Sequence, residues 1–270
     1  MKIDIPQLAS TLRTIGVTVL VTGLFTGLPT IAHSSIFWDD ELEAGNTGYG
    51  LPGGFSPPAM VFDTTVKFSG TGSLRYDYNA NCYPDSLAQT NCGGFTDRTF
   101  PATGTFYRRF YVRLSQGFTV SDVFTKLMRS DTNGLTSNWW TLGCCGNKTL
   151  EVHDQNVPVG NTSVNYASYI MPTNQWVCIE TYEKLNTPGV ADGVQQAWVD
   201  GAQVLNQTGI PFRASGDNSL YNNNRLYRQT GLGSIWFDRI AVGDTRIGCV
   251  GTPPSGDTTP PATPSGFTAR

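Results

Sequence analysis

Two runs of alternating apolar and polar residues, joined by a turn, constrain the fold of this chain more than any other feature. Residues Trp176–Gly201 read WVCIETYEKLNTPGVADGVQQAWVDG. Because residues two apart on a strand share a face, Val177 and Ile179 form an apolar side, and polar or aromatic residues form the opposite side. Asp200-Gly201 is a strong hairpin signal, since a type I′ turn needs positive φ at both central residues. The segment therefore predicts antiparallel strands with two unlike faces.

Similar alternating segments recur along most of the chain. Thr105–Leu114 reads TFYRRFYVRL and Ile235–Val242 reads IWFDRIAV, and clusters of glycine, proline, asparagine and aspartate separate such segments. Aromatic residues make up 11% of the chain and charged residues only 14%, a balance that favours strands and turns over helices. We therefore predict an all-β protein, a two-sheet antiparallel β-sandwich of the jelly-roll type.

The two ends of the chain differ from the middle. Residues 1–34 carry Lys2 and Arg13, then an uncharged apolar run and small residues before Ser34, which predicts a cleaved secretory signal peptide. We then expect a secreted, extracellular protein with no membrane attachment after cleavage, and the sandwich would span residues 35–250. An uncleaved membrane anchor is the alternative, since the apolar run is near the lower limit for a span.

Residues 251–270 read GTPPSGDTTPPATPSGFTAR, a proline- and threonine-rich segment. This composition is typical of an extended linker rather than of a packed core. Its end resembles the start of a fibronectin type III domain, which implies further domains beyond residue 270. A simple disordered tail is the alternative.

Six cysteines follow the predicted cleavage site, and an even number predicts up to three disulfides in an oxidising compartment. They are Cys82, Cys92, Cys144, Cys145, Cys178 and Cys249. We expect the first two to pair within one loop, and the adjacent third and fourth to pair with the last two. Zinc is excluded because there is no CxxC pair and only His153 follows the signal sequence. The net charge of −3 argues against nucleic-acid binding.

The second faces of several strands combine aromatic rings with charges. The residues concerned are Tyr107, Arg109, Tyr111, Trp176, Glu180 and Tyr182. Aromatic rings cover the apolar faces of sugars, while arginine and glutamate bind hydroxyl and carboxylate groups. We therefore expect these residues to gather on one concave sheet and to bind a polysaccharide. The alternative is an ordinary outer surface.

Five segments together resemble secreted bacterial proteins with the concanavalin-A-like lectin/glucanase jelly roll. They are Phe37–Gly45, Gly70–Tyr78, the strand Tyr107–Leu114, the hairpin Trp176–Gly201 and the closing Ile235–Gly248. Within that fold the group is similar to polysaccharide lyases such as glucuronan, alginate and heparin lyases. The resemblance implies a lyase that cleaves an acidic, uronate-containing polysaccharide by β-elimination, with no cofactor required for catalysis. The alternatives are a non-catalytic carbohydrate-binding or lectin-like module and a structural or adhesive surface domain.

The lyase resemblance also implies roles for individual residues. Glu151-Val152-His153 is similar to the glutamine-x-histidine strand of alginate lyases with this fold, although Glu151 stands where glutamine would. His153 would then be the base and Tyr227 the acid, with Arg109 and Lys126 neutralising the uronate carboxylate. The alternative for His153 is an ordinary surface histidine.

A glycoside hydrolase is less favoured, because the Glu-x-Asp-x-x-Glu strand of β-glucanases with this fold is absent from the sequence. Glu180 and Glu183 are three apart, so they point to opposite faces of one strand and cannot act as a pair. A structural calcium is a further prediction, with Asp40 near the start and Asp238 near the end as ligands. The alternative is a solvated acidic turn.

Overall fold

The computed structural model describes seven parts of the chain, and all regular structure in them is β-strand. The described residues are 36–42, 60–78, 94–120, 124–134, 137–143, 147–155 and 163–251. The predicted signal peptide, almost all of the predicted linker, and Cys82, Cys92, Cys144 and Cys145 lie outside them. Within the described residues, no helix has the length and apolar character needed to cross a membrane.

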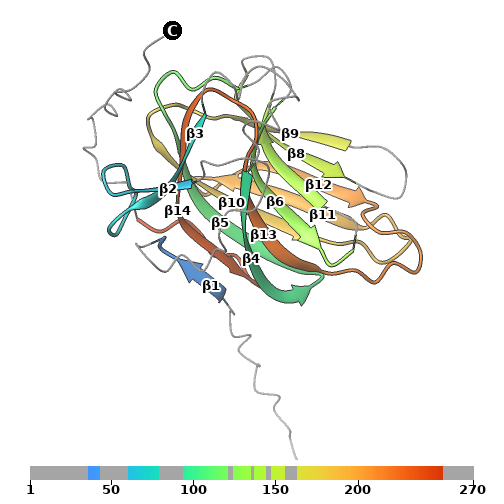
Figure 1. The fold of residues 1–270 in the computed structure, drawn as a ribbon. Coiled ribbons are helices and arrows are strands. Elements are labelled where there is room, and N and C mark those ends of the chain that lie inside the picture. Colours follow the sequence, from blue (N-terminus) through green and yellow to red (C-terminus); the bar gives the residue numbers. More distant parts are fainter. Residues whose placement is uncertain are drawn as a thin grey trace, which may run out of the picture. The chain divides into compact units, whose positions relative to one another are not determined.

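The described residues form fourteen strands (Figure 1). Their bounds are β1 (Ile36–Asp40), β2 (Met60–Asp63), β3 (Ser73–Tyr78), β4 (Gly94–Thr103), β5 (Thr105–Leu114), β6 (Thr125–Thr132), β7 (Ser137–Leu142), β8 (Thr149–Gln155), β9 (Ser163–Ile170), β10 (Trp176–Lys184), β11 (Gly193–Val199), β12 (Ala202–Ile210), β13 (Tyr221–Arg228) and β14 (Gly233–Gly243). Every pairing between them is antiparallel.

An eight-stranded sheet has the order β12-β11-β10-β5-β14-β3-β2, and β1 pairs with the second half of β14. The hairpin predicted at Asp200-Gly201 is confirmed, because these residues join β11 to β12 with φ values of 48° and 86°. β5 and β10 pair along their full length, and this register sets Arg109 directly opposite Glu180.

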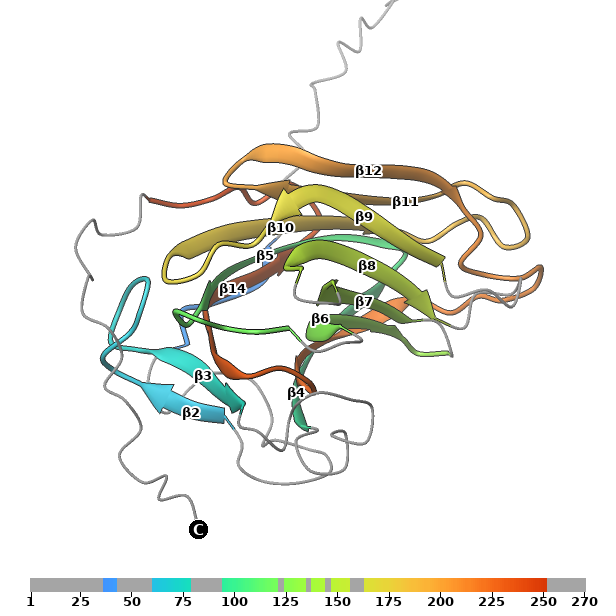
Figure 2. The ribbon, with the colours of Figure 1, turned by 90° about the horizontal axis from the view of Figure 1, so that it is seen from above.

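A six-stranded sheet has the order β4-β13-β6-β7-β8-β9. The two sheets, seen one over the other in Figure 2, share one core, so the predicted two-sheet antiparallel sandwich is confirmed. One large cluster of fully buried residues fills the space between the layers, with Phe110 and Ile179 from one sheet and Trp140 and Leu226 from the other. Burying each such side chain stabilises the fold by about 1.5–3 kcal/mol.

A buried ion pair also joins the two sheets. Arg108 Nη2 lies 3.1 Å from Glu183 Oε1, and both side chains are fully buried. The six-stranded sheet supplies further donors to this carboxylate, from the indole of Trp140 at 2.9 Å, the Ser130 hydroxyl at 2.8 Å and the Asn138 amide at 2.7 Å. The sequence analysis correctly placed Glu180 and Glu183 on opposite faces of β10.

After β14 the chain turns back over the outer face of the eight-stranded sheet, in a segment we call the C-terminal strap (residues 244–251). A disulfide joins Cys178 to Cys249, with Cα atoms 6.0 Å apart, so the predicted pairing of these two cysteines with Cys144 and Cys145 is wrong. The reason is the path of the strap. Glu180 accepts hydrogen bonds from the Ile247 and Gly248 amides at 2.6 and 2.9 Å, which holds Cys249 beside β10.

Candidate functional site

The outer face of the six-stranded sheet brings together side chains from four strands. The register places Arg129 of β6 opposite Trp139 of β7, and Trp139 opposite His153 of β8. On the other side of β6, Arg225 of β13 lies opposite Arg129. Arg225, Arg129, Trp139 and His153 therefore form one row across the four strands. Lys126 and Tyr227 lie in the adjacent row on the same face. We call Lys126, Trp139, Glu151, His153 and Tyr227 the reactive cluster.

Lys126 lies within a group of aromatic rings. Its Nζ atom is 3.4 Å from the centroid of Trp139, 5.2 Å from that of Tyr227 and 5.6 Å from that of Phe124. Burial, together with the smaller effect of the nearby Arg129 charge, lowers the pKa of Lys126 from 10.5 to about 7. At neutral pH the amine is therefore present in both its charged and its neutral form, so it can exchange a proton or meet an arriving anion.

His153 is held by the carboxylate two residues before it. Its Nε2 atom lies 3.0 Å from Glu151 Oε2, and its ring lies 4.7 Å from the ring of Phe124. An ionised carboxylate only accepts hydrogen bonds, so Nε2 carries the proton in this contact and Nδ1 keeps its lone pair. Gly143 makes room for this arrangement, because a side chain there would collide with the Glu151 carboxylate.

Tyr227 completes the reactive cluster from β13. Its ring stacks on Phe95 of β4 with centroids 5.7 Å apart, and meets Trp139 edge-on at 4.8 Å. Only 9% of the Tyr227 side chain is exposed, so neighbouring rings fix its orientation. A phenol held in this way, with the Lys126 amine 5.2 Å from its ring centroid, can donate a proton to a bound substrate.

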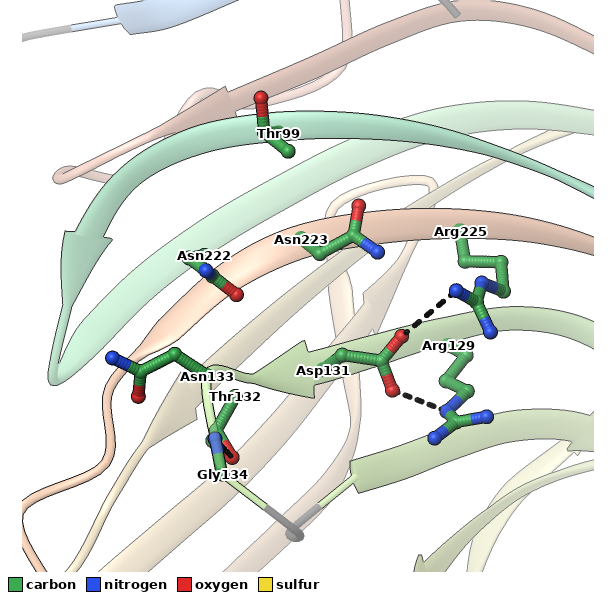
Figure 3. Close-up of a pocket in the computed structure, with 9 residues that line it drawn as sticks. All are labelled: Thr99, Arg129, Asp131, Thr132, Asn133, Gly134, Asn222, Asn223 and Arg225. Atoms are coloured by element: carbon green, nitrogen blue, oxygen red, sulfur yellow. Dashed lines mark hydrogen bonds and ion pairs between the residues drawn. The ribbon is translucent and has the colours of Figure 1, made fainter. Parts of the chain in front are cut away.

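A pocket of about 400 Å³ opens on the same face, farther along β6 and β13 (Figure 3). Its charged lining consists of Arg129, Arg225 and Asp131, and Figure 3 shows Asp131 between the two arginines. Arg129 also stacks on Trp139, at 4.4 Å from its centroid, which links the pocket to the reactive cluster. Burial raises the pKa of Asp131, and the charges of Arg129 and Arg225 oppose that rise.

The structure does not place Arg109 in this group, although the sequence suggested it as a carboxylate neutraliser. Arg109 belongs to β5 of the other sheet, where its side chain is 1% exposed and pairs with Asp39 at 2.9 Å. That prediction was wrong because the alternation on β5 shows which residues share a face but does not show which sheet carries the site. Lys126, His153 and Tyr227, by contrast, do lie on one face.

The predicted sugar-binding residues of the eight-stranded sheet do not line an open groove. Tyr111 and Trp176 are 2% and 6% exposed, because Phe68 stacks on Tyr111 at 3.8 Å and Val250 of the strap accepts a hydrogen bond from its hydroxyl. Glu180 is 1% exposed and pairs with Arg246 of the strap at 2.9 Å.

Only two of the six residues remain half-buried rather than covered. These are Tyr107 and Tyr182, whose rings lie 4.6 Å apart on neighbouring strands of the eight-stranded sheet. The predicted gathering of all six on one binding face is therefore wrong, since packed protein covers most of that face.

The carboxylates of the two predicted calcium ligands accept hydrogen bonds from groups of the protein. Asp40 accepts from Arg98 at 2.5 Å and from the Leu42 amide at 2.8 Å. Asp238 accepts from the backbone amides of Phe68 and Arg239, both at 2.7 Å. Among the described residues, no group of three His, Cys, Asp or Glu side chains could hold a metal ion. Calcium at Asp40 and Asp238 therefore stays a prediction.

Trp139, Arg129 and Arg225 were not among the residues predicted for the site. A signal for Arg225 was present, because it lies two residues before Tyr227 on one strand and so shares its face. The signal for Arg129 was hidden. It is three residues from Lys126, but a bulge between Lys126 and Met128 turns both side chains to the outer face.

Part of the chain is similar in sequence to a family of known proteins. Residues 140–231, which include Glu151, His153 and Tyr227, match the family model described as Polysaccharide lyase 14. No curated protein matches the sequence of the chain.

Several solved structures share the fold. One is the endo-β-1,4-glucuronan lyase from the fungus Trichoderma reesei, with a TM-score of 0.55 and 15% identity over 78% of this chain and 96% of that one. Another is the marine PL-14 alginate lyase from Aplysia kurodai, at 0.54 and 12% over 77% and 98%. "Cellulose induced protein, Cip1" matches at 0.55 and 17% over 79% and 100%. The concanavalin-A-like jelly roll expected from the sequence is confirmed, and the chain is similar to polysaccharide lyases both in this fold and in the sequence of residues 140–231.

Proposed function

We propose that this protein is a polysaccharide lyase that cleaves an acidic, uronate-containing polysaccharide by β-elimination on the outer face of the six-stranded sheet. The observation that carries the proposal is the reactive cluster, where Lys126, His153 and Tyr227 lie around one indole ring. The family match over residues 140–231 and the shared fold of glucuronan and alginate lyases support it.

Each step of β-elimination has a suitable group in the reactive cluster. The reaction needs a cation beside the uronate carboxylate, a base for the proton on C5 and an acid for the leaving O4. Lys126 supplies the cation, since an arriving carboxylate favours the charged form of an amine whose pKa is about 7. His153 takes the proton at Nδ1, because Glu151 occupies Nε2. Tyr227 donates its hydroxyl proton to O4.

Glu151 therefore has a positioning role in this proposal. An amide at this position could donate or accept, whereas the carboxylate only accepts and so fixes which imidazole nitrogen is protonated. The Glu151 carboxylate contacts His153, and Glu151 is only 6% exposed. The substrate carboxylate therefore meets Lys126 rather than Glu151.

We further propose that the protein acts outside the cell. The disulfide between Cys178 and Cys249 supports this, because disulfides persist in oxidising compartments. The signal peptide predicted over residues 1–34 agrees with it.

The test is an assay of the purified protein on alginate, polyglucuronate, hyaluronan and chondroitin, following the ultraviolet absorbance of the unsaturated uronate that only elimination produces. We expect product from at least one polymer, and we expect His153→Ala and Tyr227→Phe to abolish it. Lys67→Met, in a loop of the eight-stranded side, is the matched control and should keep full activity. Binding to these polymers with no unsaturated product would contradict the lyase and favour a carbohydrate-binding module.

Lys126→Arg separates two roles for the amine. Arginine keeps the charge but does not give up its proton. Activity that survives at a reduced level agrees with Lys126 as the cation. Complete loss with unchanged substrate binding would instead make Lys126 the base.

A further inference from the structure

The pocket beside the reactive cluster has arginines that are already paired with carboxylates. Arg225 donates to Asp97 from Nε and Nη2 at 2.5 and 2.9 Å, and its Nη2 lies 3.8 Å from Asp131. Arg129 pairs with Asp131 through Nε. Two positive and two negative side chains therefore meet at this pocket, and the group carries no net charge.

The rest of the lining is neutral and polar. It consists of Thr99, Thr132, Asn133, Gly134, Asn222 and Asn223. Threonine hydroxyls and asparagine amides both donate and accept hydrogen bonds, as the hydroxyl groups of a sugar do. A carboxylate only accepts, and in this pocket it would meet the like charge of Asp131 or would have to displace it from its two arginines. The pocket therefore suits an uncharged sugar better than a uronate.

The reactive cluster has the opposite character. Within the described part of the chain, no carboxylate forms an ion pair with Lys126, and burial together with Arg129 determines its pKa. The row of Arg129 and Arg225 is one side-chain repeat, about 7 Å, from the row of Lys126 and Tyr227. The row of Asp131 and Asn223 lies a second repeat farther along the strands. A sugar chain that lies along β6 and β13 thus presents one residue to Lys126 and a residue farther along the chain to the neutral pocket.

From this arrangement we infer that the substrate is a heteropolysaccharide in which uronates alternate with neutral sugars, rather than an unbroken polyuronate. The inference rests on the proposed lyase function and narrows it. The uronate binds at Lys126, where elimination takes place. The neutral sugar binds in the pocket lined by Asp131 and Asn223, and Asp131 is the residue that excludes a second carboxylate.

The experiment compares kcat/KM for the wild-type protein on two polymers that both contain 4-linked glucuronate. Unsulfated chondroitin alternates glucuronate with an uncharged sugar, whereas polyglucuronate has a carboxylate on every residue. We expect kcat/KM to be at least about tenfold higher on chondroitin. A tenfold ratio corresponds to about 1.4 kcal/mol, and bringing like charges together at a binding interface costs more free energy than that. Equal or faster cleavage of polyglucuronate would overturn the inference and leave the lyase function standing. No unsaturated product from either polymer, or from alginate and hyaluronan, would refute both.

A charge variant tests the assigned residue. Asp131→Asn removes one negative charge from the pocket, and we expect it to raise the polyglucuronate-to-chondroitin ratio of kcat/KM by about tenfold. Asp77→Asn on β3 of the other sheet is the matched control and should leave the ratio unchanged. If Asp131→Asn does not fold, Asn223→Lys adds a positive charge opposite the same position and should shift the ratio in the same direction. A ratio that neither variant changes would overturn the role of Asp131.

Discussion

Replacing Lys126 by methionine should make the protein more stable while abolishing its activity. The amine is buried among aromatic rings, and its pKa falls from 10.5 to about 7 because burial disfavours the charged form. One pKa unit corresponds to ~1.4 kcal/mol, so this difference corresponds to about 5 kcal/mol of unfavourable free energy when the amine is charged. The contact with Trp139, a cation–π interaction of about 0.5–2 kcal/mol, offsets part of it. We therefore expect Lys126→Met to gain about 3 kcal/mol at pH 6.

The pH dependence of this gain follows from the direction of the shift. The pKa of Lys126 is lower in the folded than in the unfolded state, so between pH 7 and 10.5 the unfolded state binds more protons. Folding stability therefore rises with pH across this window, and the cost of Lys126 is fully present only below pH 7. The advantage of the methionine variant should accordingly shrink to about 1.4 kcal/mol by pH ~9.5, one unit below the pKa of 10.5.

Urea denaturation of both proteins at the two pH values measures this difference directly. Lys67→Met, which removes a lysine that lies outside any aromatic cluster, should change stability by no more than about 0.5 kcal/mol at either pH. The reasoning would be refuted if Lys126→Met were no more stable than the wild type at pH 6, or if its gain did not change with pH. Loss of lyase activity together with a gain of stability would indicate that Lys126 is retained for chemistry.

Three other outcomes follow from described contacts. Glu183→Leu leaves Arg108 as an uncompensated buried charge and should lower the free energy of unfolding by about 3–5 kcal/mol in urea denaturation, whereas the pair Arg108→Met and Glu183→Leu should recover most of that loss. Cys249→Ser opens a disulfide that closes a loop of 71 residues and should cost about 4 kcal/mol, seen as a lower Tm; a Tm equal to that of the wild type would contradict the anchoring role of the strap. Glu151→Gln lets Nε2 of His153 lose its fixed proton, so kcat should fall with little change in KM and the pH profile should shift, while an unaltered kcat would remove the positioning role.

Alternation along single strands was enough to predict the sandwich and the orientation of many side chains. Glu180 and Glu183 lie on opposite faces of β10 as expected, and the Asp200-Gly201 turn has the predicted backbone. Alternation could not show what covers each face. The strap and the loop bearing Phe68 close the outer face of the eight-stranded sheet, and both reach it from distant parts of the sequence.

The candidate site was only partly predictable for the same kind of reason. The family resemblance pointed to His153, Tyr227 and Lys126, which do share a face, but it gave no information on how that face is completed. Arg129 needed the bulge in β6 to be known, and its contact with Trp139 needed the register of β6 and β7. Register between strands depends on pairing over the whole sheet, so no local pattern in the sequence reports it.

The covalent link between the strap and β10 has a mechanical consequence. β10 lies in the interior of its sheet, with hydrogen-bonded neighbours on both sides along most of its length. Tension that reaches residue 251 from anything attached beyond it would pass through Cys249 into this central strand, instead of peeling the strap away from its own end. The hydrogen bonds of β10 to β5 and β11 would then bear the force together, in shear, so the domain can hold a heavy or moving attachment without opening.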